Sequence, residues 1–198
     1  MNSSFAKAVE TLRSGGTILY PTDTIWGLGC DATNPEAVET IFRIKQRPEA
    51  KSLVLLVSDL DMLTRYVKAV PEMALDLIEV NDKPMTIIYP EAVAAEKGAP
   101  ADKRLLSANC IAEDGSVGIR IPLMEELCAM IRSFGRPIVS TSANVSGEPS
   151  PHKFADIPEE IRSAVDFTVD PALESASTGL ASQIIKLSLN GEFTIIRM

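Results

Sequence analysis

Short strand patterns alternate with helical patterns along most of the chain, and this alternation is the strongest constraint on the fold. Helical periodicity is seen at about residues 4–14, from residue 35 onward and at 123–134. Apolar runs typical of strands occupy residues 17–20, 52–57, 85–89, 116–121, 137–140 and 165–169. Alternation of this kind is typical of an α/β domain, in which helices cover the faces of a largely parallel sheet.

The last part of the chain changes to an antiparallel pattern. Residues 182–189 and 192–196 read as two strands joined by Asn190-Gly191, a dipeptide that favours a tight hairpin turn. We therefore predict one domain over residues 1–198, with a twisted mixed sheet flanked by helices. Two short helices are expected on either side of Pro71 and another at 158–163, while residues 91–115 are expected to be loop and short helix.

Composition and charge exclude several classes of function. The longest apolar runs have about five residues, too few for a membrane span, and residues 1–7 lack a secretory signal pattern, so a cytoplasmic location is predicted. Cys30, Cys110 and Cys128 are widely spaced and are expected to be reduced thiols. His152 is the single histidine, which excludes a multi-histidine metal site. The net charge of −8 repels nucleic acid, so any basic surface has to be local.

A basic cluster occupies the end of the second predicted helix, which begins at Asn34-Pro35 and is expected to end at Pro48. Four of the 19 cations fall within nine residues, where Glu49 is the lone acid; they are Arg43, Lys45, Arg47 and Lys51. Convergent cations suit a polyphosphate ligand. The alternative is a solvated helix end whose cations complement the helix dipole.

Three further segments combine a strand with polar or small residues. In residues 116–121 the apolar side chains point to one face, and Ser116, Gly118 and Arg120 point to the other. Residues 140–147 come directly after a strand and contain four hydroxyl side chains and Asn144. Such a loop at the end of a strand is able to bind a ligand. Residues 20–29 leave a strand into a loop with two threonines and two glycines. Each pattern also has a purely structural explanation, as a half-exposed strand or a turn.

These segments together carry a resemblance to a known family. The stretches YPTDTIWGLG (20–29), KQRPEAK (45–51), SVGIRIP (116–122) and STSANVSG (140–147) resemble the YrdC-like family of L-threonylcarbamoyladenylate synthases, and the match runs from about residue 10 to 197. The resemblance implies that L-threonine, bicarbonate and ATP react, with Mg²⁺, to give threonylcarbamoyl-adenylate and pyrophosphate. It also implies hand-over of this product to a transferase that modifies the adenosine beside the anticodon of tRNA, and weak contact with tRNA or double-stranded RNA.

The resemblance also assigns roles to individual residues. Lys45, Arg47 and Arg120 are expected to act in catalysis. The residues expected to bind the nucleotide are Lys45, Arg47, Ser116, Arg120, Ser142, Asn144, Ser150 and Arg197. Those expected on the threonine side are Thr22, Thr24, Lys51, Ser140 and Ser182. No protein ligand of the metal can be named. We expect Lys45→Ala and Arg120→Ala to abolish adenylate formation and to leave the fold intact, because both residues are placed on polar faces.

Three segments depart from the family pattern: 81–84 (Asn-Asp-Lys-Pro), 170–172 (Asp-Pro-Ala) and Gln183. They concern the wall of the threonine pocket and the C-terminal nucleotide contacts. Two other functions stay open from the residues alone. One is an RNA-binding maturation factor without catalysis, which the negative net charge disfavours. The other is a serine hydrolase that uses Ser142 with Lys45 or Lys51 as the base.

Overall fold

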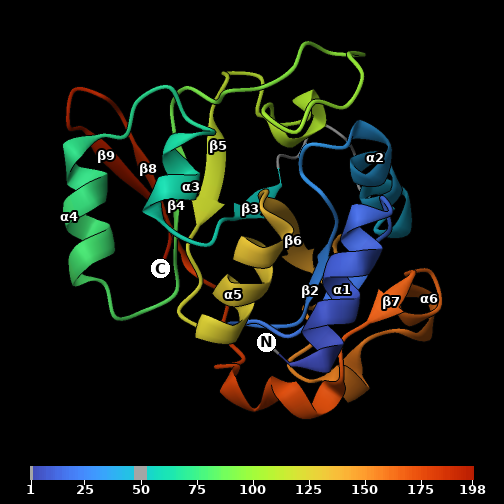
Figure 1. Cartoon of the computed structure of the whole chain (residues 1–198). Helices are drawn as coiled ribbons and strands as arrows, with labels where there is room; N and C mark the ends of the chain where they lie inside the picture. Colours follow the sequence, from blue (N-terminus) through green and yellow to red (C-terminus); the bar gives the residue numbers. More distant parts are fainter. Residues whose placement is uncertain (1, 47–52) are drawn as a thin grey trace.

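The computed structural model describes residues 2–46 and 53–198, and within them it contains one nine-stranded sheet (Figure 1). The spatial order of the strands is β7-β1-β2-β6-β3-β5-β4-β8-β9. Their bounds are β1 Ile18–Tyr20, β2 Gly27–Gly29, β3 Val54–Leu56, β4 Met85–Tyr89, β5 Val117–Arg120, β6 Ile138–Ser142, β7 Phe167–Thr168, β8 Gln183–Leu187 and β9 Phe193–Arg197. The pairs β1–β7, β3–β5 and β4–β8 are parallel and the others antiparallel, which confirms the predicted mixed sheet.

The helices begin and end close to the predicted positions. Their bounds are α1 Ser3–Arg13, α2 Pro35–Ile44, α3 Leu60–Thr64, α4 Glu72–Val80, α5 Glu125–Phe134 and α6 Glu159–Arg162, with 3₁₀ turns η1 Ala108–Cys110, η2 Phe154–Asp156 and η3 Pro171–Ala176. The Asn34 side chain accepts a hydrogen bond from the Glu36 amide at 3.1 Å and caps α2. Gly135 ends α5 in the left-handed conformation, with φ +84°. Helix α2 ends at Ile44, earlier than Pro48, which lies outside the described residues.

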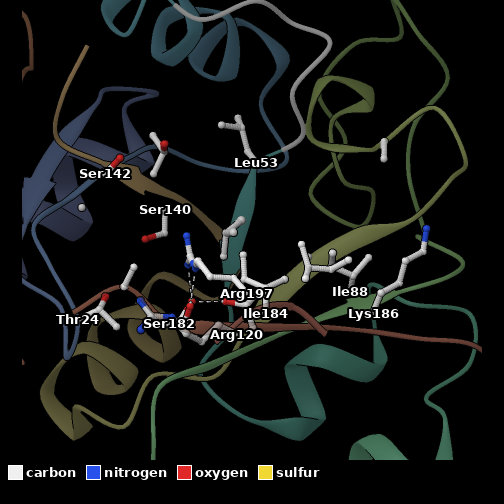
Figure 2. A pocket seen from close by; sticks show the side chains of 18 of the residues that line it. Thr24, Leu53, Ile88, Arg120, Ser140, Ser142, Ser182, Ile184, Lys186 and Arg197 are labelled. Carbon is white, nitrogen blue, oxygen red and sulfur yellow. Dashed lines mark hydrogen bonds between the residues drawn. The ribbon is translucent and has the colours of Figure 1, made fainter. Parts of the chain in front are cut away.

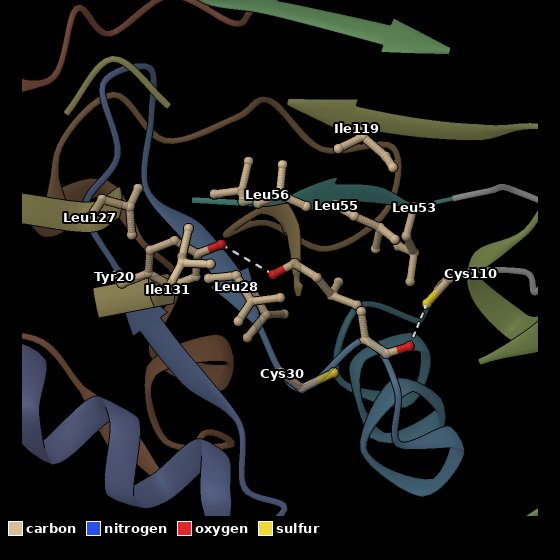
Figure 3. Packing of buried hydrophobic residues seen from close by; sticks show 14 of the residues in the cluster. Tyr20, Leu28, Cys30, Leu53, Leu55, Leu56, Cys110, Ile119, Leu127 and Ile131 are labelled. Atoms are coloured by element: carbon tan, nitrogen blue, oxygen red, sulfur yellow. Dashed lines mark hydrogen bonds between the residues drawn. The ribbon is translucent and has the colours of Figure 1, made fainter. Parts of the chain in front are cut away.

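The hydrophobic core lies between the sheet and the helices α1 and α5, which run side by side (Figure 1). Figure 3 shows Leu28 of the sheet near Leu127 and Ile131 of α5, with Leu55 and Ile119 farther along the sheet, and all five belong to one buried cluster. Burying each such side chain contributes about 1.5–3 kcal/mol. The three cysteines are free thiols in or beside this core, as predicted. In the described residues no helix combines the length and the apolar character needed to cross a membrane.

Strand β2 was not expected, because residues 20–29 read as a strand followed by a loop. Its sequence is Gly-Leu-Gly, so Leu28 supplies the one side chain that a strand pattern could register. The glycines permit close packing: a Cβ on Gly29 would lie 2.2 Å from the carbonyl oxygen of Val139. Strand β6 also continues to Ser142, two residues beyond its predicted end, because Ser142 and Thr141 pair with β2.

Candidate functional site

A cavity of about 910 Å³ collects residues from segments far apart in the chain. Its lining comes from the loop before β2 and from β3, β4, β5, β6, β8 and β9. Eight of the residues expected in the site line it: Thr24, Ser116, Arg120, Ser140, Ser142, Ser150, Ser182 and Arg197 (Figure 2). The structure therefore brings most of the predicted site residues together in one hollow.

Strand β5 explains how the site and the core share one sheet. Val117 and Ile119 are buried in the core, whereas Ser116, Gly118 and Arg120 line the cavity, as their alternation predicts. A Cβ added to Gly118 would meet the side chains of Thr86, Ile88 and Val54 at 3.5–3.9 Å, and all three line the same cavity. Gly118 thus forms a floor that a ligand can approach closely.

Arg120 is held in place by an ion pair that sequence reasoning did not identify. One of its terminal nitrogens lies 2.8 Å from Oδ1 of Asp23, and the side chains are 4% and 7% exposed. The second carboxylate oxygen of Asp23 accepts a hydrogen bond from the Leu123 amide at 3.0 Å. Asp23 lies within the YPTDT stretch, which the sequence analysis also explained as a structural turn. The pair fixes the guanidinium at the edge of the cavity.

Arg197 brings a second guanidinium to the same end of the cavity. Its Nε donates to the Ser182 carbonyl at 2.9 Å, and a terminal nitrogen lies 3.4 Å from the Ser182 hydroxyl (Figure 2). Partial burial and the positive charge of Arg120 lower the pKa of Arg197. Two cations that repel each other beside a single carboxylate form a site that an anion stabilises.

The hydroxyl groups lie close to these two arginines. In Figure 2 Thr24, Ser140 and Ser182 surround Arg120 and Arg197, and the hydroxyl of Ser182 is 2.8 Å from that of buried Thr86. Hydroxyls can donate and accept hydrogen bonds, so this end suits a small polar ligand that carries both amino and carboxylate groups. Thr86 is a site residue that the sequence did not reveal.

The opposite end of the cavity combines an aliphatic side chain with a lysine. Figure 2 places Ile88 and Lys186 far from Ser140, whereas Val54 and Ile184 pair with Ser140 and Arg197 and so lie at the hydroxyl-rich end. The Lys186 ammonium is 2.6 Å from Asp114, and this bond together with that from Ser116 holds the pKa of Asp114 well below its usual range. An aliphatic side chain with a lysine at the rim is able to hold a flat ring that carries phosphates.

Lys45, Thr22 and Asn144 lie behind the wall of the cavity. The Lys45 side chain is 1% exposed, and its ammonium donates to the carbonyls of Ser142 at 2.5 Å and Asn144 at 2.6 Å. Thr22 is hydrogen-bonded to the Thr24 hydroxyl at 2.7 Å. These contacts position the lining residues, and direct contact of Lys45 with a nucleotide stays a prediction. Arg47 and Lys51 lie outside the described residues.

The burial of Lys45 and Arg120 corrects the expectation that their loss leaves the fold intact. Both side chains are almost fully buried and hydrogen-bonded, so alanine at either position leaves buried polar partners unsatisfied. The hydrolase hypothesis also loses support for Lys45 as the base, while Lys51 lies outside the described residues. An amine that donates to two carbonyl oxygens is not oriented to take a proton from the Ser142 hydroxyl.

The three departures from the family pattern are accommodated without loss of the cavity. Gln183 pairs with Met85 in the sheet and leaves Ser182 on the wall, and Asp170 caps η3 through the amide of Ala172. Asn81 follows the end of α4 and forms a short turn with Lys83. These substitutions act in the framework around the site.

Known proteins are similar to this chain in sequence and in architecture. The family of Sua5, YciO and YrdC, described as telomere recombination, matches residues 10–198. The chain belongs to the Sua5/YciO/YrdC family. A threonylcarbamoyl-AMP synthase of Stenotrophomonas maltophilia is 34% identical over 82% of this chain and 83% of that protein. One from Pseudoalteromonas translucida is 30% identical over 96% of both chains.

Solved structures of the Sua5/YciO/YrdC family superimpose on the whole fold. Sua5 of P. abyssi, solved with L-threonine, has a TM-score of 0.74 and 26% identity and covers 92% of this chain. This chain spans 50% of the length of that protein. YciO of E. coli has a TM-score of 0.73 and 27% identity, covering 98% of this chain and 87% of its own. HypF, solved with phosphate and nucleotide, is 20% identical with a TM-score of 0.76, which shows the shared fold alone.

Proposed function

We propose that this chain is an L-threonylcarbamoyladenylate synthase, which converts L-threonine, bicarbonate and ATP into threonylcarbamoyl-AMP and pyrophosphate. The observation that carries the proposal is one cavity in which hydroxyls and two guanidiniums meet at one end and Ile88 and Lys186 lie at the other. Its volume of about 910 Å³ is large for a small-molecule site and suits two substrates at once. The relatives that bear this enzyme name support the same conclusion.

Threonine binds at the hydroxyl-rich end in this proposal. Thr24, Ser140 and Ser182 supply hydrogen bonds to its amino, carboxylate and hydroxyl groups, and Thr22 orients Thr24 from behind. The nucleotide lies along Gly118 and Ser116 toward Ile88 and Lys186, with Ser142 and Ser150 also in the lining. Hydrogen bonds to the threonine hydroxyl select against valine more strongly than a methyl contact selects against serine.

The chemistry needs fixed positive charge more than a nucleophilic side chain. The threonine amine and bicarbonate give a carbamate and water. A carbamate oxygen then forms a bond to the α-phosphorus of ATP while the bond to the bridging oxygen breaks, and pyrophosphate leaves with the negative charge. Arg120 is fixed by Asp23 and Arg197 by Ser182, so both cations are oriented before the charge develops.

Magnesium fits this site as an ion that arrives with ATP. No group of three or more His, Cys, Asp or Glu side chains able to hold a metal occurs within residues 2–46 and 53–198. The lining offers Glu113 and Asp114, and Asp114 is paired with Lys186. This donor set suits an ion held mainly by phosphate oxygens and water, which would neutralise charge on the phosphates.

The product is a reactive mixed anhydride and is therefore expected to pass to a second enzyme. We propose that this enzyme is a transferase that moves the threonylcarbamoyl group to tRNA adenosine. Any direct contact of this chain with tRNA is expected to be weak, because the net charge of −8 opposes the approach of phosphates.

The decisive experiment measures pyrophosphate release from ATP with threonine and bicarbonate. Release that needs both co-substrates supports the proposal, and equal release when either is omitted contradicts it. Arg197→Met should lower the rate by about 10²-fold, because it removes one cation from the developing charge. Arg132→Met, at a half-exposed arginine of α5, is the matched control and should keep full activity. RNA binding without pyrophosphate release would favour the non-catalytic maturation factor.

A further inference from the structure

A second cavity, about 690 Å³ in volume, shares no lining residue with the first. Its lining comes from the last residues of α1 and α5, from Arg65 and Tyr66 just after α3, and from the loop at residues 103–104. Five of its eight lining residues are cations; the full lining is Arg13, Arg65, Tyr66, Lys103, Arg104, Phe134, Gly135 and Arg136. We propose that this cavity is a second binding site, separate from the synthase site, for a compact anion that carries at least two phosphates.

Two buried aromatic side chains and an arginine form the floor of the second cavity. Tyr66 and Phe134 are buried, and the Arg136 guanidinium lies 4.3 Å above the centre of the Phe134 ring. The Arg136 side chain is 13% exposed and forms one ion pair, 3.1 Å from Asp31. Among the described residues it forms no other hydrogen bond, so further N–H groups of this guanidinium are available to a ligand.

The rim carries four more cations, and acids next to them pair with two. Arg65 is 3.8 Å from Asp61 and Arg104 is 2.9 Å from Asp102. The Arg65 pair is long and exposed, whereas Arg104 binds both carboxylate oxygens of Asp102. Arg13 and Lys103 are therefore the rim cations without a paired carboxylate among the described residues. Lys103 forms no ion pair with a described carboxylate, and the hydrogen bond from the Tyr66 hydroxyl to its carbonyl, 2.9 Å long, holds its backbone in place.

Helix dipoles explain only part of this charge. Arg13 donates to the carbonyl of Ser133 near the end of α5 at 2.7 Å, which is an ordinary contact of a cation with a helix C-terminus. Lys103 and Arg104 belong to a loop and to no helix. Capping therefore does not explain why they share one cavity lining with Arg65.

A compact polyphosphate fits the cavity better than an extended nucleic acid. Guanidinium groups bind phosphate oxygens in pairs, and a cavity of this size is within the range of small-molecule sites. The rest of the chain is acidic, since the other 14 cations share it with 27 acidic residues. A duplex that extended beyond the rim would meet this negative surface.

The test follows backbone amide signals by ¹⁵N NMR during titration with inorganic pyrophosphate. We expect the amides of Tyr66, Arg104 and Gly135 to shift and saturate. The double variant Arg65→Ala/Lys103→Ala should bind at this site at least tenfold more weakly. Lys7→Ala/Lys83→Ala removes the same charge from exposed positions outside both cavities and should bind like the wild type.

Two further titrations separate the sources of the phosphate. Adenosine should leave these amides unshifted. Pyrophosphate and ATP of equal affinity would identify free polyphosphate as the ligand, and tighter binding of ATP would identify a nucleotide. Shifts confined to Gly118 and Ser142, or equal affinity in both double variants, would overturn the proposal. So would an RNA duplex that binds the same amides more tightly than pyrophosphate. Pyrophosphate release by the synthase reaction is a separate measurement, so either proposal can fail alone.

Discussion

Replacing Asp23 by Asn should lower the stability of the protein by about 3–5 kcal/mol, because it leaves the Arg120 guanidinium buried without its anion. The separation of 2.8 Å and the exposures of 4% and 7% place this pair among buried salt bridges. In a domain of this size each kcal/mol corresponds to about 2–4 °C in melting temperature, so a decrease of about 6–20 °C is expected.

The assay is thermal unfolding followed by circular dichroism, with two controls. Asp61→Asn breaks the exposed pair with Arg65, where the side chains are 90% and 54% exposed, and should change the free energy of unfolding by about 1 kcal/mol or less. The double variant Asp23→Asn/Arg120→Met removes both charges and should regain part of the lost stability. Pyrophosphate release should still fall in the double variant, because the site has lost a cation.

An unchanged melting temperature in Asp23→Asn would refute this reasoning. It would mean that water or another group already solvates Arg120, so that the guanidinium is not held by Asp23. A double variant less stable than the two single changes predict would also contradict it, because removal of both charges should leave no unpaired ion.

Three further predictions concern the cavity floor, the thiols and acid stability. Gly118→Ala should weaken ATP binding, and Gly118→Val should weaken it further, with little change in melting temperature. The added Cβ meets Thr86 and Ile88 at ordinary contact distances of 3.5 and 3.8 Å, so the new side chain fits and occupies the cavity. Calorimetric titration with ATP measures this, and an affinity equal to that of the wild type would place the nucleotide elsewhere. Burial raises the pKa of Cys128 to about 11 and also raises the pKa values of Cys30 and Cys110, so at pH 8 all three thiols should react slowly with a disulfide reagent and react fully after unfolding. A fast-reacting thiol in the native protein would show that the core opens there. The lowered pKa of Asp114 adds stability that is present above its unfolded pKa of about 3.9 and is lost as the pH falls further. Asp114→Asn should therefore reduce the loss of unfolding free energy below pH 4 by up to about 1 kcal/mol. An identical pH profile would contradict the contact with Lys186.

The sequence predicted the α/β class, the mixed sheet and the C-terminal hairpin, because these depend on periodicity and on turn residues. It missed β2, since a strand made of two glycines and Leu28 has no alternating side chains to detect. Strand pairing there is set by close contact of Gly29 with the backbone of β6, a tertiary effect that local patterns do not carry.

The site was predicted in part for a similar reason. Alternation in β5 correctly placed Gly118 and Arg120 on the face opposite the core, where they line the cavity, because a strand has a fixed period. Lys45 was expected at the cavity surface, but it follows α2, where its long side chain reaches behind β6 to the Ser142 carbonyl. The second basic cavity left no sequence signal, since Arg13, Arg65 and Lys103 come from three distant segments.

A segment outside the four family stretches holds the loop of residues 20–29 in place. The carbonyl of Asp23 accepts hydrogen bonds from the amide and the hydroxyl of Thr178, at 3.1 and 3.0 Å. Trp26 donates to Glu174 at 2.7 Å, and the same carboxylate oxygen accepts the Phe154 amide at 2.8 Å. Residues 174–178 therefore clamp the loop that presents Asp23 to Arg120. Asp23 is held by Thr178, and Asp23 in turn holds the guanidinium of Arg120, so the direction of this positive charge is fixed. A fixed charge of this kind is what electrostatic stabilisation of a transition state requires.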